Sequence, residues 1–160
     1  MTAELSHLVD GWARLYGDQK MLSAGISFVH LAGILLAGGF AIAADRSSLR
    51  LAPDAEDAQR ELARLQTVHG WVIFGLAITI VAGLLMMLAD IKTYLPSLLF
   101  WTKIGLIVLL LANGAVRSRA ERKLLAGSAS GWRSFRLTSA LSLVLWFSIL
   151  LAGSFLSTLS

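Results

Sequence analysis

Four long apolar stretches constrain this chain more than any other feature. They lie at about residues 22–44, 68–89, 95–116 and 137–159. Each is close to the ~20 residues that an α-helix needs to cross ~30 Å of hydrocarbon. A membrane β-barrel would instead show strands of about ten residues with alternating apolar and polar side chains. The pattern therefore predicts an all-α integral membrane protein, a four-helix bundle in one domain that covers residues 1–160.

The composition supports lipid as the surrounding solvent. The chain is 56% hydrophobic and 15% charged, with a mean hydropathy of +0.71, whereas soluble domains carry about 25% charged residues. It has no cysteine, which excludes disulfides and Cys-ligated metals. The net charge of +4 reflects basic residues that flank the spans, because no free basic helix with stacking aromatics occurs. We expect a lipid bilayer as partner and no nucleic acid.

The basic residues predict an orientation. Most of the 14 Lys and Arg residues lie between spans one and two or between spans three and four: Arg46, Arg50, Arg60, Arg64, Arg117, Arg119, Arg122, Lys123, Arg133 and Arg136. The positive-inside rule places these segments in the cytoplasm. We expect a multi-pass protein of a bacterial inner membrane with both termini in the periplasm. The first span is longer than a signal-peptide core, so we favour its retention over cleavage after Ala43.

The segments outside the spans also carry helical patterns. In residues 1–20, one face of a helix would be apolar: Leu5, Leu8, Val9, Trp12, Leu15 and Tyr16. Such a helix lies on a membrane surface or against a protein partner. Pro53 and Asp54 are typical of a helix start, and a stripe from Ala55 to Leu76 extends the second span into one long helix. The short link 90–96 predicts an antiparallel hairpin of spans two and three, and 127–131 predicts a turn.

Small residues indicate where the helices pack. They recur along spans one and two, at Ser23, Ser27, Gly33, Ala37 and Ala41 and at Gly75, Thr79 and Gly83. Close approach of helix backbones drives association in lipid, because apolar side chains gain nothing there by burial. Two polar side chains, Asn113 and Trp146, are expected to make hydrogen bonds between helices.

Three ionisable residues within or beside the spans are candidate site residues, because polar groups are costly in a bilayer. His30 shares a face with the small residues of span one. It is either a neutral histidine bonded to a neighbouring helix, or a ligand for haem or copper, or a proton-handling group. His69 lies on the packing stripe near the start of span two and allows the same interpretations. Lys103 either extends its ammonium to the outer interface or faces a carboxylate such as a haem propionate.

The depth of the two histidines decides whether they can share one iron. Counted from the edges of the apolar stretches, they differ by about 15 Å in depth, which forbids a shared ion. Counted from a turn at Leu51–Pro53, the difference falls to about 6 Å, which tilt could close. We favour separate sites, and the sequence leaves the shared site open.

Two runs resemble a loose group of small bacterial membrane proteins. One is Phe28-Val29-His30-Leu31-Ala32-Gly33 followed by Ala37-Gly38-Gly39 and Arg46; the other is Trp101-Thr102-Lys103 followed by Leu109 to Asn113, Arg117 and Arg119. The group comprises the copper-resistance protein D family and the membrane-bound protoporphyrinogen oxidase family. The resemblance implies a four-helix unit with a histidine-linked haem or copper site, with His30 as ligand and Lys103 as second matched position. A tryptophan that the group has near the end of the first run is missing here.

These observations support three classes of function. The first is a membrane protein with an inward-facing histidine site at His30, His69 and Lys103, with haem b as favoured cofactor and redox or electron transfer as its role. The second is a non-catalytic membrane subunit, which assembles with a protein partner or as a homo-oligomer. The third is copper or small-solute transport, with copper the weaker cofactor and Met86 and Met87 as thioether ligands. Whether the chain is an enzyme stays open, since no Ser-His-Asp set, phosphate-binding loop or H-E-x-x-H motif occurs.

Overall fold

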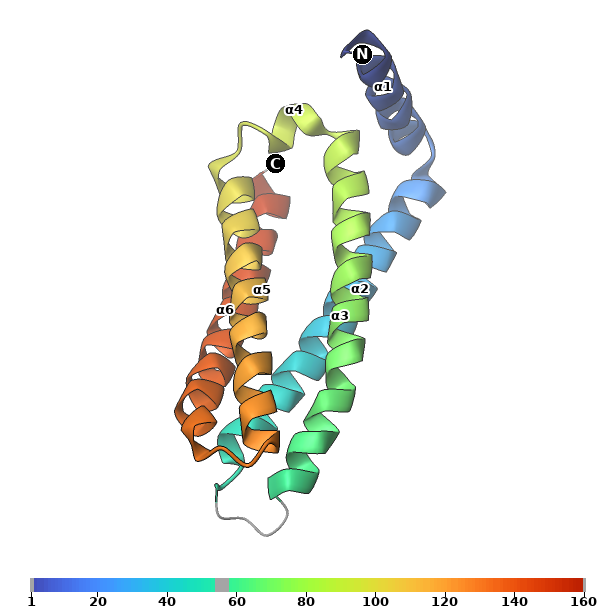
Figure 1. The fold of residues 1–160 in the computed structure, drawn as a ribbon. Coiled ribbons are helices and arrows are strands. Elements are labelled where there is room, and N and C mark those ends of the chain that lie inside the picture. The colour runs from blue at the N-terminus through green and yellow to red at the C-terminus, as the bar shows by residue number, and fades with distance from the viewer. Residues whose placement is uncertain (1, 54–57, 160) are drawn as a thin grey trace.

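A computed structural model describes residues 2–53 and 58–159, and the described residues form helices joined by short links (Figure 1). The elements in chain order are α1 Thr2–Asp18, α2 Lys20–Arg50, α3 Ala58–Ala89, α4 Ile91–Tyr94, α5 Leu98–Leu125, the short 3₁₀ turn η1 Ala129–Gly131 and α6 Trp132–Leu159. Four of the helices are long and apolar enough to cross a membrane. The predicted all-helical architecture with four candidate spans is confirmed.

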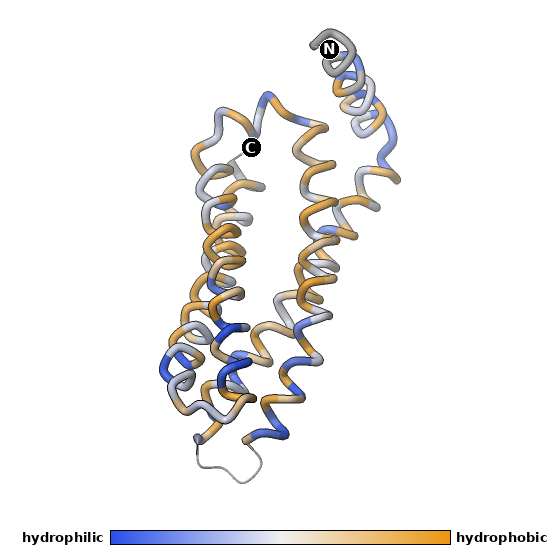
Figure 2. The backbone as a smooth tube through the Cα atoms, viewed as in Figure 1, coloured by the Kyte–Doolittle hydropathy of each residue, from blue (hydrophilic) through white to orange (hydrophobic). Residues whose placement is uncertain are grey.

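The candidate spans are longer than the apolar stretches that predicted them. Helix α2 has 31 residues, α3 has 32 and α5 has 28. The extra turns of α2, α3 and α5 lie at one end of the bundle, which we call the basic end and define by residues 51–53 and the link 126–128. Figure 2 shows hydrophilic residues gathered there. The predicted extension of span two is confirmed from Ala58 onward, whereas the predicted start at Asp54 lies outside the described residues.

Local side chains explain where several helices begin and end. Ser97, which follows Pro96, accepts a hydrogen bond from the Phe100 amide at 3.3 Å and caps α5. Asp90 caps α4 in the same way through the Thr93 amide. After α5, Gly127 has a φ of +82°, a backbone conformation that side chains disfavour. The predicted turn at 127–131 is therefore present.

Helix α2 organises the bundle. It packs along α3 on one side and against α6 on the other, while α5 packs mainly on α6 (Figure 1). Helices α3 and α5 are antiparallel and joined through α4, as the sequence predicts, but each packs more extensively on another helix than on its hairpin partner. The chain begins and ends at the end opposite the basic end, which we call the α4 end.

Small residues bring α2 and α3 into backbone contact. A Cβ placed on Gly75 would lie 2.7 Å from the Ala37 amide nitrogen, and one on Gly33 would lie 2.5 Å from the Thr79 hydroxyl. Neither position admits a larger residue without separating the helices. The predicted close packing of spans one and two is confirmed, and it fixes which residues of α3 lie level with those of α2.

The outer faces of the helices are apolar. Large hydrophobic side chains are exposed along the candidate spans, among them Phe28, Leu35, Leu98 and Phe147. Contiguous exposed apolar surface of this extent is unfavourable in water and typical of contact with lipid. Two inner clusters hold the helices together, one around Leu110 and Trp146 at mid-bundle and one around Leu62 and Phe135 at the basic end.

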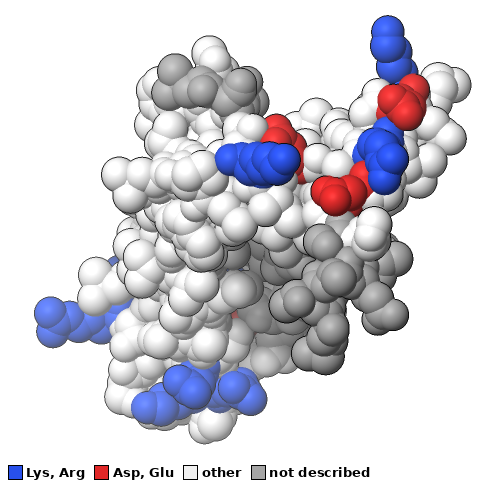
Figure 3. Space-filling model, turned by 90° about the horizontal axis from the view of Figure 1, so that it is seen from above, with Lys and Arg blue, Asp and Glu red and all other residues white. Residues whose placement is uncertain are grey.

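The predicted N-terminal helix is present as α1 and packs on the α4 end. The indole nitrogen of Trp12 donates a hydrogen bond to the Leu85 carbonyl of α3 at 2.9 Å. Burial, with the charges of Asp90 and Tyr16, raises the pKa of Tyr94 in the link beneath. Figure 3 looks down on this end, whose described surface carries few charged side chains, of both signs. The end therefore differs in charge from the basic end.

Candidate functional site

His30 projects from α2 against α3 and is half-buried. Its Nδ1 lies 2.9 Å from the backbone carbonyl oxygen of Thr79. Because a carbonyl only accepts hydrogen bonds, this contact requires the proton on Nδ1. The other ring nitrogen, Nε2, then carries the lone pair. A backbone carbonyl that fixes the tautomer in this way is a common support for metal-ligating histidines, and it leaves Nε2 ready to bind.

Gly83 makes room for the ring. It lies one turn beyond Thr79 on α3, and a Cβ built there would be 3.0 Å from Cε1 of His30 and 3.3 Å from Nδ1. A side chain at this position would press the imidazole away from the Thr79 carbonyl. The small-residue pattern predicted for helix packing therefore also positions the histidine.

Lys103 of α5 packs against α6. It is half-buried, and a Cβ built on Gly153 of α6 would lie 3.4 Å from its Nζ. Its positive charge acts electrostatically on His30. Among the described residues, no carboxylate lies within ion-pair distance of its ammonium. Lys103 thus brings an uncompensated cation toward the histidine from the opposite helix pair.

His69 belongs to a different part of the bundle. Its Nε2 lies 3.1 Å from the Ser118 hydroxyl of α5. His30 contacts α3 at Thr79, ten residues beyond His69, or about 15 Å along the helix axis. Two nitrogens on one metal ion lie only about 4 Å apart, since each bond is ~2 Å. The structure therefore separates the two histidines, in agreement with the favoured sequence interpretation of two sites.

A site with several metal ligands is not formed by the described residues. Within residues 2–53 and 58–159, no group of three or more His, Asp or Glu side chains could hold a metal ion. Haem needs only one or two axial ligands from the protein, whereas bound copper usually takes three or more. His30 offers one available nitrogen, Nε2, at this position.

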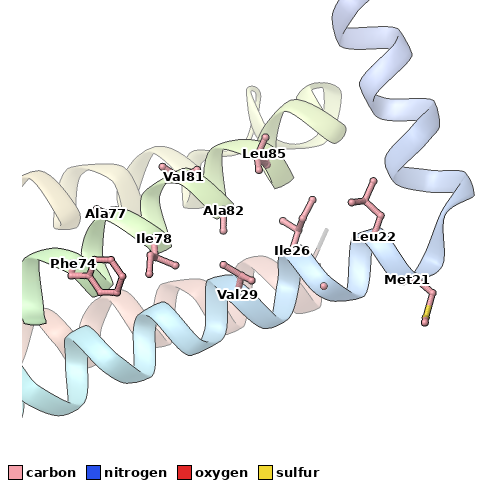
Figure 4. A pocket seen from close by; sticks show the side chains of 11 residues that line it. Met21, Leu22, Ile26, Val29, Phe74, Ala77, Ile78, Val81, Ala82 and Leu85 are labelled. Carbon is pink, nitrogen blue, oxygen red and sulfur yellow. The ribbon is translucent and has the colours of Figure 1, made fainter.

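An apolar groove runs between α2 and α3 near the α4 end. Its volume is about 570 Å³, and Figure 4 shows side chains from both helices around it, including Ile26, Val29 and Ile78. None of His30, His69 and Lys103 lines this groove. It offers no polar group to orient a substrate and belongs to the lipid-facing surface rather than to the histidine site.

Sequence reasoning missed a buried charged cluster at the basic end. Arg117, which the sequence analysis counts among the basic residues that predict the orientation, is 8% exposed and pairs with Asp45 of α2, with 3.4 Å between Nε and Oδ1. Its Nη2 donates to the Ser48 hydroxyl at 2.8 Å. Glu121, one turn further along α5, is also buried. Glu121, an acid within a stretch of basic residues, was the available signal in the sequence. To use this signal, one would have to know that α2 and α5 continue beyond their apolar stretches.

The two predicted polar contacts between helices have different outcomes. Asn113 donates through Nδ2 to the Thr138 carbonyl of α6 at 2.8 Å, as expected. Trp146 makes no hydrogen bond through its indole nitrogen, so that expectation is wrong. Its ring packs over Gly38, where a Cβ would lie 3.4 Å from the indole carbons. Close packing of the large ring takes precedence over its polar atom.

Known proteins do not extend these observations: no protein-family model matches the chain, and neither does any curated protein or solved structure.

Proposed function

We propose that this chain binds haem b through His30 in a membrane and serves a redox or electron-transfer role. The observation that carries the proposal is the contact between His30 Nδ1 and the Thr79 carbonyl, which leaves Nε2 as a free axial ligand. A bound haem would supply a one-electron redox centre. The proposal agrees with what the resemblance implies for His30.

Lys103 has the chemistry of a propionate partner. Its ammonium faces the inside of the bundle without a carboxylate among the described residues, and its charge acts on His30. A haem propionate would neutralise it, since an unpaired ammonium in an apolar surrounding is costly. The absence of side chains at Gly83 and Gly153 lets the His30 ring and the Lys103 side chain pack directly against the neighbouring helices. One nitrogen ligand and one counter-ion are the donors that a b-type haem requires.

The orientation of the protein belongs to the same proposal. We place the basic end in the cytoplasm of a bacterial inner membrane by the positive-inside rule. Both chain termini are then periplasmic, since they lie at the α4 end. Lys103 is five residues into α5 and His30 is ten residues into α2, so both lie within about 15 Å of the periplasmic helix ends.

A non-catalytic membrane subunit is the second candidate, and the position of α1 favours it. This amphipathic helix extends beyond the spans at the α4 end (Figure 1), attached to α3 through Trp12. A protein partner that covers α1 would use the surface that the bilayer interface otherwise covers.

The experiment that separates the two compares haem content in matched histidine variants. The wild type, His30→Ala and His69→Ala are expressed with ample haem, purified in mild detergent and assayed for haem per chain. We expect His30→Ala to lose the haem and His69→Ala to keep it, because His69 bonds to Ser118 at a separate level of the bundle. Haem retained by His30→Ala would refute the assignment. A colourless wild type with a co-purifying protein would favour the subunit.

Lys103 is tested by its effect on potential. Lys103→Met keeps the length of the side chain and removes the charge. A cation beside the haem favours the reduced, less positive iron, so its removal is expected to lower the midpoint potential. Lys92→Met, at an exposed position outside the spans, is the control and should leave the potential unchanged. Equal potentials in both variants would remove Lys103 from the site.

A further inference from the structure

A second buried polar site lies at the basic end, away from His30. It contains Asp45 of α2, Arg117 and Glu121 of α5, and the serines Ser48, Ser139 and Ser142, and we call it the Asp45 cluster. Asp45 is 1% exposed and Glu121 is 3% exposed. The proposed haem site uses none of these residues. Two acids and one guanidinium are thus enclosed where three helices meet.

The cluster has one negative charge too many. With both carboxylates ionised, Arg117 compensates only one of them. The guanidinium is held in place by the Ser48 hydroxyl and by the Phe135 ring, whose centroid is 5.4 Å from Cζ. Arg117 is the charged side chain that acts on both Asp45 and Glu121. An uncompensated charge in a buried site costs several kcal/mol, so proteins normally neutralise it.

Several polar atoms of the Asp45 cluster also lack hydrogen-bond partners. Both carboxylate oxygens of Asp45, Oε1 of Glu121 and the hydroxyl of Ser139 are buried without a hydrogen-bond partner. Ser139 is fully buried on α6, and its hydroxyl lies beside the Asp45 carboxylate. Buried polar atoms are nearly always paired. A protonated carboxyl can donate as well as accept, which a carboxylate cannot.

We propose that the Asp45 cluster binds one exchangeable proton, which is carried by one of its two buried acids, Asp45 or Glu121. The bound proton makes the cluster neutral and adds one hydrogen-bond donor to its buried carboxyl groups. His69, on α3, is the further titratable group near Arg117, and α6 contributes only hydroxyls beside Asp45. The inference stands on Asp45, Arg117, Glu121 and Ser139 and does not rest on haem binding.

The site is close enough to solvent for exchange. Glu121 lies four residues before the end of α5 at Leu125, and Asp45 lies five before the end of α2 at Arg50. Both are therefore within about 8 Å of a helix terminus along the axis. This short distance to the helix ends is the expected route of proton exchange with water at the basic end.

Infrared spectroscopy of the wild-type chain in detergent tests the inference directly. A protonated carboxylic acid has a C=O stretch at higher frequency than any carboxylate, and that band shifts in D₂O. We expect such a band at neutral pH, with a shift that appears on transfer to D₂O. Its absence from the wild type would overturn the proposal without recourse to any variant.

Variants assign the band. Asp45→Asn and Glu121→Gln each leave Arg117 with one carboxylate, so loss of the band in either variant supports the site. Arg117→Met leaves two acids without a cation, and the band should roughly double. The control Glu61→Gln removes a partly exposed acid of α3 that pairs with Arg64 and should leave the band intact. A band that survives in both Asp45→Asn and Glu121→Gln would place the proton elsewhere and overturn the proposal.

Discussion

The imidazole of His30 and the backbone carbonyl of Thr79 lie 2.9 Å apart across the interface of α2 and α3. This contact sets both the tautomer and the direction of the ring. It depends on the close approach of the two helices, which glycines permit at positions 33, 75 and 83. The same interface therefore determines both the helix packing and the chemistry of the site. Substitutions of different glycines can test the two effects separately.

Gly83→Ala is predicted to weaken the site more than the fold. Its Cβ would lie 3.0 Å from Cε1 of His30, so the ring must move by a few tenths of an ångström. We expect lower haem content per chain with a stability loss of about 1 kcal/mol, at the low end for overpacking. Gly114→Ala is the control, because a Cβ there meets nothing within 4 Å. Equal haem content in the two variants would contradict this role for Gly83.

Gly75→Ala is predicted to weaken the fold itself. The added Cβ would lie 2.7 Å from the backbone nitrogen of Ala37, and backbone cannot rotate away as a side chain can. We expect thermal unfolding in detergent to show a loss of about 1–3 kcal/mol. Gly39→Ala, where a Cβ meets nothing within 4 Å, should be neutral or up to about 1 kcal/mol more stable through helix propensity. If both substitutions had the same effect, the α2–α3 contact would not be the constraint.

Arg117→Met is predicted to destabilise the basic end at neutral pH. It leaves Asp45 and Glu121 buried without a cation, and removal of one partner from a buried pair costs about 3–5 kcal/mol. The loss should shrink as the pH falls, because the buried acids take up protons on folding and this uptake costs less free energy at lower pH. The double variant Asp45→Asn/Arg117→Met should recover most of the stability at neutral pH. A single variant within about 0.5 kcal/mol of the wild type would show that the pair is not structural.

The sequence predicted the number, order and type of the long helices because about 20 apolar residues in a row admit few alternatives. It also predicted that spans one and two pack through Gly33, Gly75 and Thr79, because small residues at helical spacing have a direct steric meaning. The depth of each residue relative to the residues of neighbouring helices was harder to predict. Two ways of counting depth for His30 and His69 differed by more than 5 Å, and only the contact with Thr79 decided between them.

The Asp45 cluster could not be predicted for a related reason. The apolar stretch of span one ends near Ala44, so Asp45 belongs by sequence to a polar loop. In the structure α2 continues to Arg50, and the extra turns bring Asp45 against Arg117 of α5. A stretch of apolar residues predicts which part of a helix can face lipid, but it does not predict where the helix ends.

The central claim is that His30 holds a haem, and the absorption spectrum of the purified wild-type chain tests it most directly. The protein is expressed with ample haem, purified in mild detergent and measured in the oxidised form and after reduction with dithionite. The account predicts a Soret band, with α and β bands that sharpen on reduction, at about one haem per chain. A colourless preparation that stays colourless after incubation with haem would contradict it.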